Sequence, residues 1–132
     1  MECRDVFLAK NVVLHEKDFF GNYIRSVVLA LRESGFRVGD FDMLIYSEIP
    51  VAWGLASSVA LQVAVLGALN ELFGFNLAKH DIAELAYHNE HDIMGISCGR
   101  LDQYGSSMGG ITRINTKPPY STKTYEGFTG FL

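Results

Sequence analysis

The stretch Pro50–Ala60, PVAWGLASSVA, places small residues and two hydroxyls directly before a long apolar run. That run, Val59–Leu69, is apolar on nearly every side of a helix, so we expect a central buried helix that ends near Phe73. Ser57 or Ser58 is suited to cap its start, because a hydroxyl accepts a hydrogen bond from the free N–H groups there. The same N–H groups attract phosphate, and small side chains let a phosphate approach the backbone. The loop alone leaves both interpretations open.

Composition restricts the class of protein. The chain has 132 residues, of which 48% are hydrophobic and 20% are charged, as in a globular domain. A formal net charge of −4, with the lysines and arginines scattered, argues against a nucleic acid as the main partner. The apolar run at 59–69 is interrupted by Gln62 and is too short to span a membrane. Only two cysteines are present, and the N-terminus is acidic where a signal peptide would be basic, so we expect a cytoplasmic protein.

Hydrophobic patterning predicts strands and helices in mixed order, which indicates an α+β domain. A helix capped by Asp18, with an apolar face from Phe20 to Leu31, should stop at Ser34-Gly35. A further helix is expected over Asn76–His91, with Ile82, Leu85, Ala86 and Asn89 facing inward. Short strands are expected at Phe7–Leu14, Phe41–Tyr46 and Gly110–Asn115. Residues Gly95–Ser107 are expected to form a loop that can hold a short helix, and Pro118-Pro119 should interrupt regular structure.

A second segment, His88–Gly105, reads HNEHDIMGISCGRLDQYG and carries two carboxylates of interest. Phosphoryl transfer needs magnesium to bridge the phosphates and a carboxylate near the attacking hydroxyl. Glu90 and Asp102 lie 12 positions apart, which leaves room for a turn that brings both carboxylates to the opening of one site. On their own, two acids at this distance are weak evidence, because acidic residues mostly lie on the solvated surface.

Together the two segments resemble the GHMP kinase superfamily, which includes galactokinase, homoserine kinase and mevalonate kinase. The phosphate loop of that family follows the pattern P-x-x-x-G-L-G-S-S-A. Its positions are occupied here by Pro50, Gly54, Leu55, Ala56, Ser57, Ser58 and Val59, with Ala56 in place of a glycine and Val59 in place of the alanine. The later segment EHDIMGISCGRLDQ is most similar to the galactokinase branch. The resemblance runs from about Phe20 through Gly110.

The resemblance implies an ATP-dependent kinase that transfers the γ-phosphoryl group to a hydroxyl of a small molecule. A sugar is the favoured acceptor, and a mevalonate- or homoserine-type kinase is the alternative. It also implies the two-layer fold of ribosomal protein S5 domain 2, with residues 1–132 as part of an N-terminal, ATP-binding domain and the C-terminal domain absent. By the same resemblance the loop at 50–58 binds ATP, Ser58 and Glu90 hold Mg²⁺, and Asp102 is the catalytic base.

Other interpretations stay open. A non-catalytic sensor of nucleotide or sugar would need the loop but not both acids. Apolar surface left exposed would let the chain form a dimer. His88, His91 and Cys98 form a candidate zinc site, but imidazoles near a helix C-terminus are favoured by its dipole without any metal.

Overall fold

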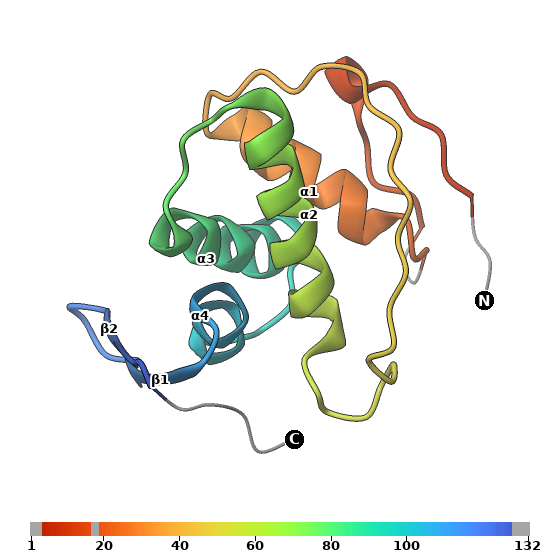
Figure 1. The fold of residues 1–132 in the computed structure, drawn as a ribbon. Helices are drawn as coiled ribbons and strands as arrows, with labels where there is room; N and C mark the ends of the chain where they lie inside the picture. Colours follow the sequence, from red (N-terminus) through yellow and green to blue (C-terminus); the bar gives the residue numbers. More distant parts are fainter. Residues whose placement is uncertain (1–3, 17–18, 128–132) are drawn as a thin grey trace.

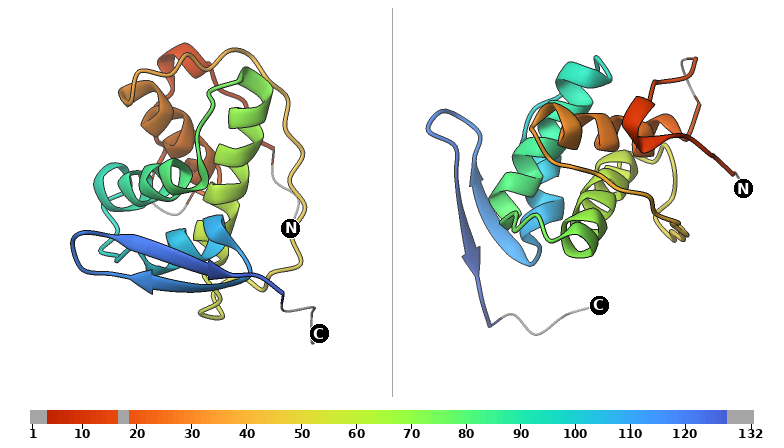
Figure 2. Two further views of the ribbon diagram at one scale, coloured as in Figure 1. Left: turned by 60° about the vertical axis from the view of Figure 1, so that its left-hand side comes forward. Right: turned by 90° about the horizontal axis from the view of Figure 1, so that it is seen from above.

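The described part of the chain folds into a small α+β domain of four α-helices and a two-stranded sheet, and the order of patterns predicted the α+β class. The structure is a computed structural model that describes residues 4–16 and 19–127. Its elements are the 3-10 turn η1 (Ala9–Asn11), α1 (Asn22–Glu33), α2 (Ser57–Phe73), α3 (Lys79–His88), the π-helical turn η2 (Asn89–Ile93), α4 (Leu101–Met108), β1 (Ile111–Asn115) and β2 (Ser121–Tyr125). The helices pack together, and the hairpin of β1 and β2 lies at the side of α4 (Figures 1 and 2). Within the described ranges, no helix is long and apolar enough to cross a membrane.

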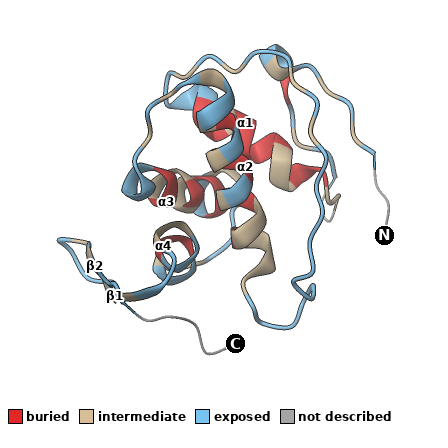
Figure 3. Cartoon of the chain, viewed as in Figure 1, coloured by how far each residue is buried: buried red, intermediate tan, exposed pale blue. Residues whose placement is uncertain are grey.

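Helix α2 is the central element, as its sequence predicted. It packs against α1, α3 and α4, so apolar side chains are needed on several of its faces. Leu66 and Leu69 are fully buried in the core, and Val65 is nearly so. Figure 3 shows the buried residues on the helix faces that point toward one another. This contact between helices is the hydrophobic core of the domain.

Helix α1 has the apolar face and the C-terminal end that its spacing predicted, but it begins at Asn22 with Gly21 at its N-cap, later than a cap at Asp18 would place its start. Val27, Val28 and Leu31 have no exposed surface and pack into the core. The helix ends at Glu33, and Gly35 then adopts a φ of +90°, a conformation that glycine reaches without strain. The predicted cap, Asp18, lies outside the described residues.

The predicted helix over 76–91 is divided differently in the structure. Asn76 has a φ of +59°, and α3 begins only at Lys79. The Asp81 carboxylate in the first turn of α3 accepts a hydrogen bond from the N–H of Ala78 at 2.9 Å. Beyond His88 the chain continues as the wider π-helical turn η2. Ile82, Ala86 and Asn89 are buried as predicted, and Leu85 is partly buried against the core. The segment 95–107, expected to be mostly loop, contains most of α4.

The strand predicted at 110–115 is β1, and its partner β2 was not predicted. The two strands pair antiparallel, with Arg113 opposite Lys123, and Pro118-Pro119 lies in the turn between them. The Arg100 guanidinium lies between two rings, at 3.7 Å from the centroid of Tyr87 and 4.1 Å from that of Tyr120. Because Tyr120 precedes β2 and Tyr87 belongs to α3, this cation–π stack fastens the hairpin to the helices.

The structure has no strand at the described residues 7–14 or 41–46, so both of these predictions are wrong. The first segment contains η1, and in the second no backbone–backbone hydrogen bond forms among the described residues. The alternation that suggested a strand is nevertheless present. Phe41 and Met43 pack against the core, whereas Leu44 and Tyr46 are 96% and 83% exposed. The segment therefore has the side-chain pattern of a strand without the neighbouring strand that would pair with it.

The N-terminal segment is tied to α1 by the buried side chain of Arg25. Its guanidinium donates two hydrogen bonds to the Asp5 carboxylate, at 2.7 and 2.8 Å, and one to the carbonyl oxygen of Val13 at 3.0 Å. The hydrogen bond and charge of Arg25 hold the pKa of Asp5 below its usual value of 3.8, although partial burial of the carboxyl opposes this. The N-terminal segment is thus held to α1 by side-chain hydrogen bonds of Arg25, not by the backbone hydrogen bonds of a sheet.

We expect Asp5→Asn to lower the free energy of unfolding at pH 7 by about 2 kcal/mol, because it removes a charged hydrogen-bond acceptor from a buried guanidinium. The lowered pKa of Asp5 stabilises the folded state above pH 3.8, and this stabilisation is lost as the pH falls through the lowered value. Denaturant unfolding at several pH values should show the difference between wild type and variant shrinking in acid. Asp40→Asn, a change at an exposed acid, is the control. A difference that does not depend on pH would contradict the ion-pair explanation.

Candidate functional site

The loop before α2 is exposed and tightly curled. Ala52, Gly54 and Ala56 have φ values of +64°, +72° and +53°, and the residues between them do not have positive φ. Residues of positive φ that alternate with residues of negative φ can turn backbone N–H groups toward one concave side, which is a known way to bind anions. Trp53 is 77% exposed and Leu55 is 58% exposed. The loop therefore makes few contacts that would compete with a ligand.

The prediction that Ser57 or Ser58 caps α2 is wrong. The residue at the N-cap is Ala56, and no side chain caps the helix start. Both serines lie inside the first turn, and the Oγ of Ser58 donates a hydrogen bond to Glu90 instead, at 3.4 Å. The first N–H groups of an α-helix have no partner within the helix, so the start of α2 remains available to an anion.

The backbone at Ala56 explains why the related motif has glycine at this position. With φ of 53° and ψ of 35°, Ala56 is in the left-handed region, where a β-carbon crowds the backbone. Glycine has no β-carbon and adopts this conformation without strain. The alanine is accommodated here, at a cost in stability.

The two segments that carry the candidate residues meet at Ser58 and Glu90. Ser58 comes from the first turn of α2, and Glu90 comes from η2, which follows α3. Glu90 is 5% exposed, and its carboxylate faces the start of α2. An aliphatic hydroxyl and a carboxylate are oxygen donors of the kind that Mg²⁺ prefers.

Three buried carboxamides form a cluster with Glu90. The sequence predicted that Asn89 faces inward, but it assigned none of the three a role in the site. Gln103 donates to Oε2 of Glu90 at 2.8 Å, and Gln62 donates to Oε1 at 3.5 Å. Asn89 donates to Oε1 of Gln62 at 2.7 Å. A signal was present in the sequence, because Ser58 and Gln62 are four positions apart and share a face of a helix that is otherwise apolar.

Asp102 lies in the first turn of α4, directly before Gln103, and its side chain is exposed. It makes no hydrogen bond to another described residue. Cys98 lies beside Gln103, whose Nε2 is 3.8 Å from the Cys98 Sγ. Partial burial and the negative charge of Glu90 raise the pKa of the Cys98 thiol, which makes it a poor nucleophile at neutral pH. Asp102 is thus the exposed acid of this region, and Glu90 is the buried one.

The residues of the candidate zinc site do not gather around one point. His88 and His91 each contact Asp92 through Nδ1 at 2.7 Å, and His88 also contacts Glu33 at 3.3 Å. The pKa of Asp92 is lowered by its contacts with His91 and His88. Among the described residues, no group of three His, Cys, Asp or Glu side chains is placed to hold a metal ion. These imidazoles therefore belong to a hydrogen-bonded cluster with Asp92 and Glu33 at the surface.

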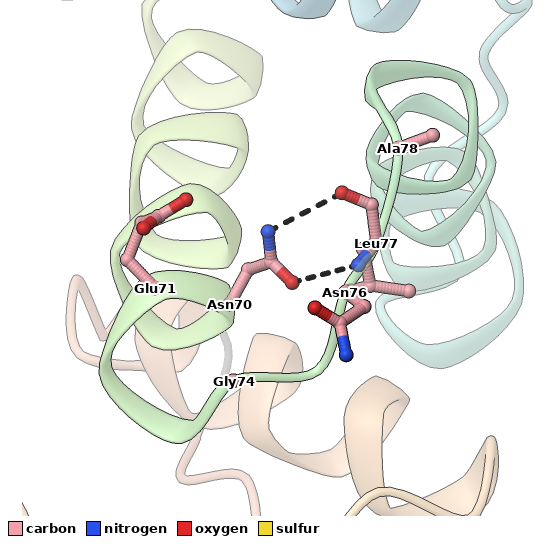
Figure 4. Close-up of a pocket in the computed structure, with 6 residues that line it drawn as sticks. All are labelled: Asn70, Glu71, Gly74, Asn76, Leu77 and Ala78. Carbon is pink, nitrogen blue, oxygen red and sulfur yellow. Dashed lines mark hydrogen bonds between the residues drawn. The ribbon is translucent and has the colours of Figure 1, made fainter.

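A hollow of about 350 Å³ lies away from these residues, at the other end of α2. Figure 4 shows that it is formed by the connection from α2 to α3, where Asn70 binds both the N–H and the C=O of Leu77, at 2.9 and 3.3 Å. Ser58 and Asn70 are 12 residues apart in one helix, a distance of about 18 Å along its axis. The hollow is therefore separate from the Ser58–Glu90 site.

The family of the chain is shown by comparison with known proteins. Residues 22–110 match the family described as GHMP kinases N terminal domain, so the chain belongs to the GHMP kinase family. It is 35% identical over 88 residues to a galactokinase of Thermotoga maritima, a match that covers 67% of this chain and 25% of the relative. It is 40% identical over 108 residues to a galactokinase of Roseiflexus sp. (73% and 28%), and 30% identical over 129 residues to one of Clostridium beijerinckii (92% and 33%). The chain thus spans about a quarter to a third of the length of these relatives.

We expect Ala56→Gly to raise the free energy of unfolding by up to about 1 kcal/mol. Relief of left-handed strain is worth about 1–2 kcal/mol, and the added freedom of glycine in the unfolded chain offsets part of it. Ala64→Gly is the matched control, because Ala64 is an exposed position in the interior of the same helix, where glycine costs about 1 kcal/mol. Denaturant unfolding should give opposite signs for the two variants. Equal destabilisation would contradict the left-handed backbone at Ala56.

Proposed function

We propose that this chain forms the ATP-binding part of a kinase that transfers the γ-phosphoryl group of ATP to a hydroxyl of a sugar. The observation that carries the proposal is the meeting of Ser58 and Glu90 at the start of α2, next to the curled loop. Membership of the GHMP kinase family and similarity to galactokinases support the reaction type and a sugar as acceptor. The proposal includes the two-layer fold of ribosomal protein S5 domain 2 and a cytoplasmic location.

The phosphates would bind at the loop and the first turn of α2. The loop that follows Pro50, which itself has no N–H, supplies backbone N–H groups at Gly54, Leu55 and Ala56. Ser57 and Ser58 add N–H groups at a helix start without a side-chain cap. These partial positive charges complement a triphosphate. Small side chains at 54 and 56–58 allow a close approach to the backbone.

Magnesium would be held by Ser58 and Glu90. These residues fit the ion because both supply oxygen ligands and because the Glu90 carboxylate faces no Lys, Arg or His at ion-pair distance in the described part of the chain. When bound, the ion neutralises charge on the β- and γ-phosphates. The protein's own contribution is to hold a buried carboxylate next to the anion-binding start of a helix.

Asp102 would orient the acceptor hydroxyl and take its proton. Its exposure leaves the carboxylate open to a substrate, and its place before Gln103 keeps it near Glu90. A mevalonate- or homoserine-type kinase is the alternative within the family. A non-catalytic sensor of nucleotide or sugar is the alternative from another class, and turnover separates it from a kinase.

We expect the purified chain to show a saturable change in the fluorescence of Trp53, its only tryptophan, with ATP and Mg²⁺ but not with adenosine and Mg²⁺. In a full-length protein that contains this domain, Asp102→Ala should keep the ATP-dependent change. The same variant should lose at least about 100-fold in turnover of a sugar acceptor, because general base catalysis is removed.

Asp81→Ala, a change at an exposed acid at the start of α3, is the control for turnover. Full activity in Asp102→Ala would overturn the role of Asp102. Nucleotide binding without turnover of any hydroxyl acceptor by the unsubstituted protein would favour the sensor. Phosphorylation of mevalonate but of no hexose would reject the sugar as acceptor.

We also propose that the isolated chain self-associates through the extended segment 41–46. Its backbone lacks a paired strand among the described residues, and Leu44 and Tyr46 expose their side chains, so a second copy can pair with this edge. Light scattering should show a mass that rises with concentration. Leu44→Lys should suppress the rise, whereas Leu72→Lys, at a 61% exposed position of α2, should not. A constant monomer mass over the series would refute this proposal.

A further inference from the structure

Glu90 lies in a cluster of carboxamide side chains that is almost completely shielded from solvent. Gln62 and Asn89 have no exposed surface, Gln103 is 1% exposed, and Glu90 itself is 5% exposed. Each carboxamide is linked to the carboxylate, Gln103 and Gln62 directly and Asn89 through Gln62. The cluster joins α2, η2 and α4, because each of these elements contributes at least one member.

The donors around the carboxylate are all neutral. Ser58 contributes a hydroxyl, Gln62 and Gln103 contribute amide N–H groups, and no Lys, Arg or His of the described segments is close enough for an ion pair with Glu90. Neutral donors fix the direction of a carboxylate and leave its negative charge uncompensated. Burial of such a charge is unfavourable unless a cation or further hydrogen bonds are supplied.

Two oxygen atoms of the cluster show that it is not optimised for stability alone. A carboxylate only accepts hydrogen bonds, so each amide must turn its nitrogen toward the acceptor that it serves. As a result, Oδ1 of Asn89 and Oε1 of Gln103 are buried without a donor among the described residues. An apolar side chain of the same size would avoid this cost. The cost indicates that the amide nitrogens are retained for what they do to Glu90.

We propose that Gln103 and Gln62 are positioning residues that aim the Glu90 carboxylate at a divalent cation, and that Asn89 fixes the orientation of Gln62. This inference rests on the proposed function, because Glu90 is taken as a cation ligand there. Gln103 has the larger effect, since its 2.8 Å hydrogen bond is shorter than the 3.5 Å contact from Gln62. Partners in the second layer of a metal site commonly change metal affinity by about 10- to 100-fold when removed.

Gln103 also connects two parts of the proposed site. It is adjacent to Asp102 in the first turn of α4, so the bond that orients Glu90 also fixes the helix turn that carries Asp102. Loss of that bond should therefore affect cation binding first and the placement of Asp102 second. This order distinguishes a positioning role from general support of the fold.

The sequence offers a direct spectroscopic test, because Gln62 and Gln103 are the only glutamines in the chain. Labelling with ¹⁵N-glutamine should give two side-chain NH₂ signals, both from the cluster. Mn²⁺, used in place of Mg²⁺, should broaden both signals in the wild-type chain. It should not broaden them in Glu90→Met, a variant that removes the carboxylate without adding a third glutamine.

The affinity for Mn²⁺, measured by electron paramagnetic resonance, should fall about 10-fold or more in Gln103→Met, which keeps the length of the side chain and removes its N–H donors. Asn22→Leu is the matched control, because it removes a 7% exposed carboxamide that binds His15 and Glu16 near the start of α1. This control should leave Mn²⁺ affinity unchanged. Circular dichroism should show that each variant keeps its helices. If Gln103→Met does not fold, Gln62→Met takes its place, with a smaller expected loss of Mn²⁺ affinity.

The outcomes separate the two hypotheses. Loss of affinity in both Glu90→Met and Gln103→Met, with Asn22→Leu unchanged, supports the metal site and the positioning role. Loss in Glu90→Met with full affinity in Gln103→Met overturns the positioning role and leaves the proposed function standing. Weak or absent Mn²⁺ binding that Glu90→Met does not alter overturns the metal site, and the positioning role with it.

Discussion

One buried carboxylate links three elements of this domain by directional contacts. Glu90 lies where α2, η2 and α4 meet, and its oxygens accept hydrogen bonds from Ser58, Gln62 and Gln103. Apolar packing between the helices supplies most of the free energy of folding, but it is not directional. Hydrogen bonds to a buried carboxylate require their donors at defined positions, so these bonds add a directional constraint to the packing of α2, η2 and α4.

The π-helical turn η2 makes this arrangement geometrically accessible. In an α-helix, successive residues are about 100° apart around the axis. In η2 the ring closes between the Met94 N–H and the Asn89 carbonyl, five residues apart, and the turn is wider. Asn89 and Glu90 are therefore both buried and both reach Gln62 of α2. A wide turn of this kind often marks a functional site in a helix.

The sequence predicted those elements whose causes lie within their own residues. The α1 face that includes Val27 and Leu31, and its glycine stop, depend on local spacing and local backbone freedom. The segment 41–46 was predicted to be a strand, but a strand requires a hydrogen-bonded neighbour, and no described segment pairs with it. Ser58 was predicted to be a cap because hydroxyls at helix starts commonly cap them. Its hydroxyl instead bonds to Glu90, 32 positions away. Local patterns do not reveal this contact, and only the family resemblance brought the two residues together.

The same distinction separates the two halves of the candidate site. Glu90 and Asp102 were located by their motif, yet the carboxamides that hold Glu90 depend on three elements coming together and were not predicted. The loop half is exposed, and its properties follow from backbone conformation at Ala56. The carboxylate half is buried, and its properties follow from hydrogen bonds such as that of Gln103. Substitutions in the loop therefore act through local backbone strain, whereas substitutions around Glu90 act through the orientation of one charge.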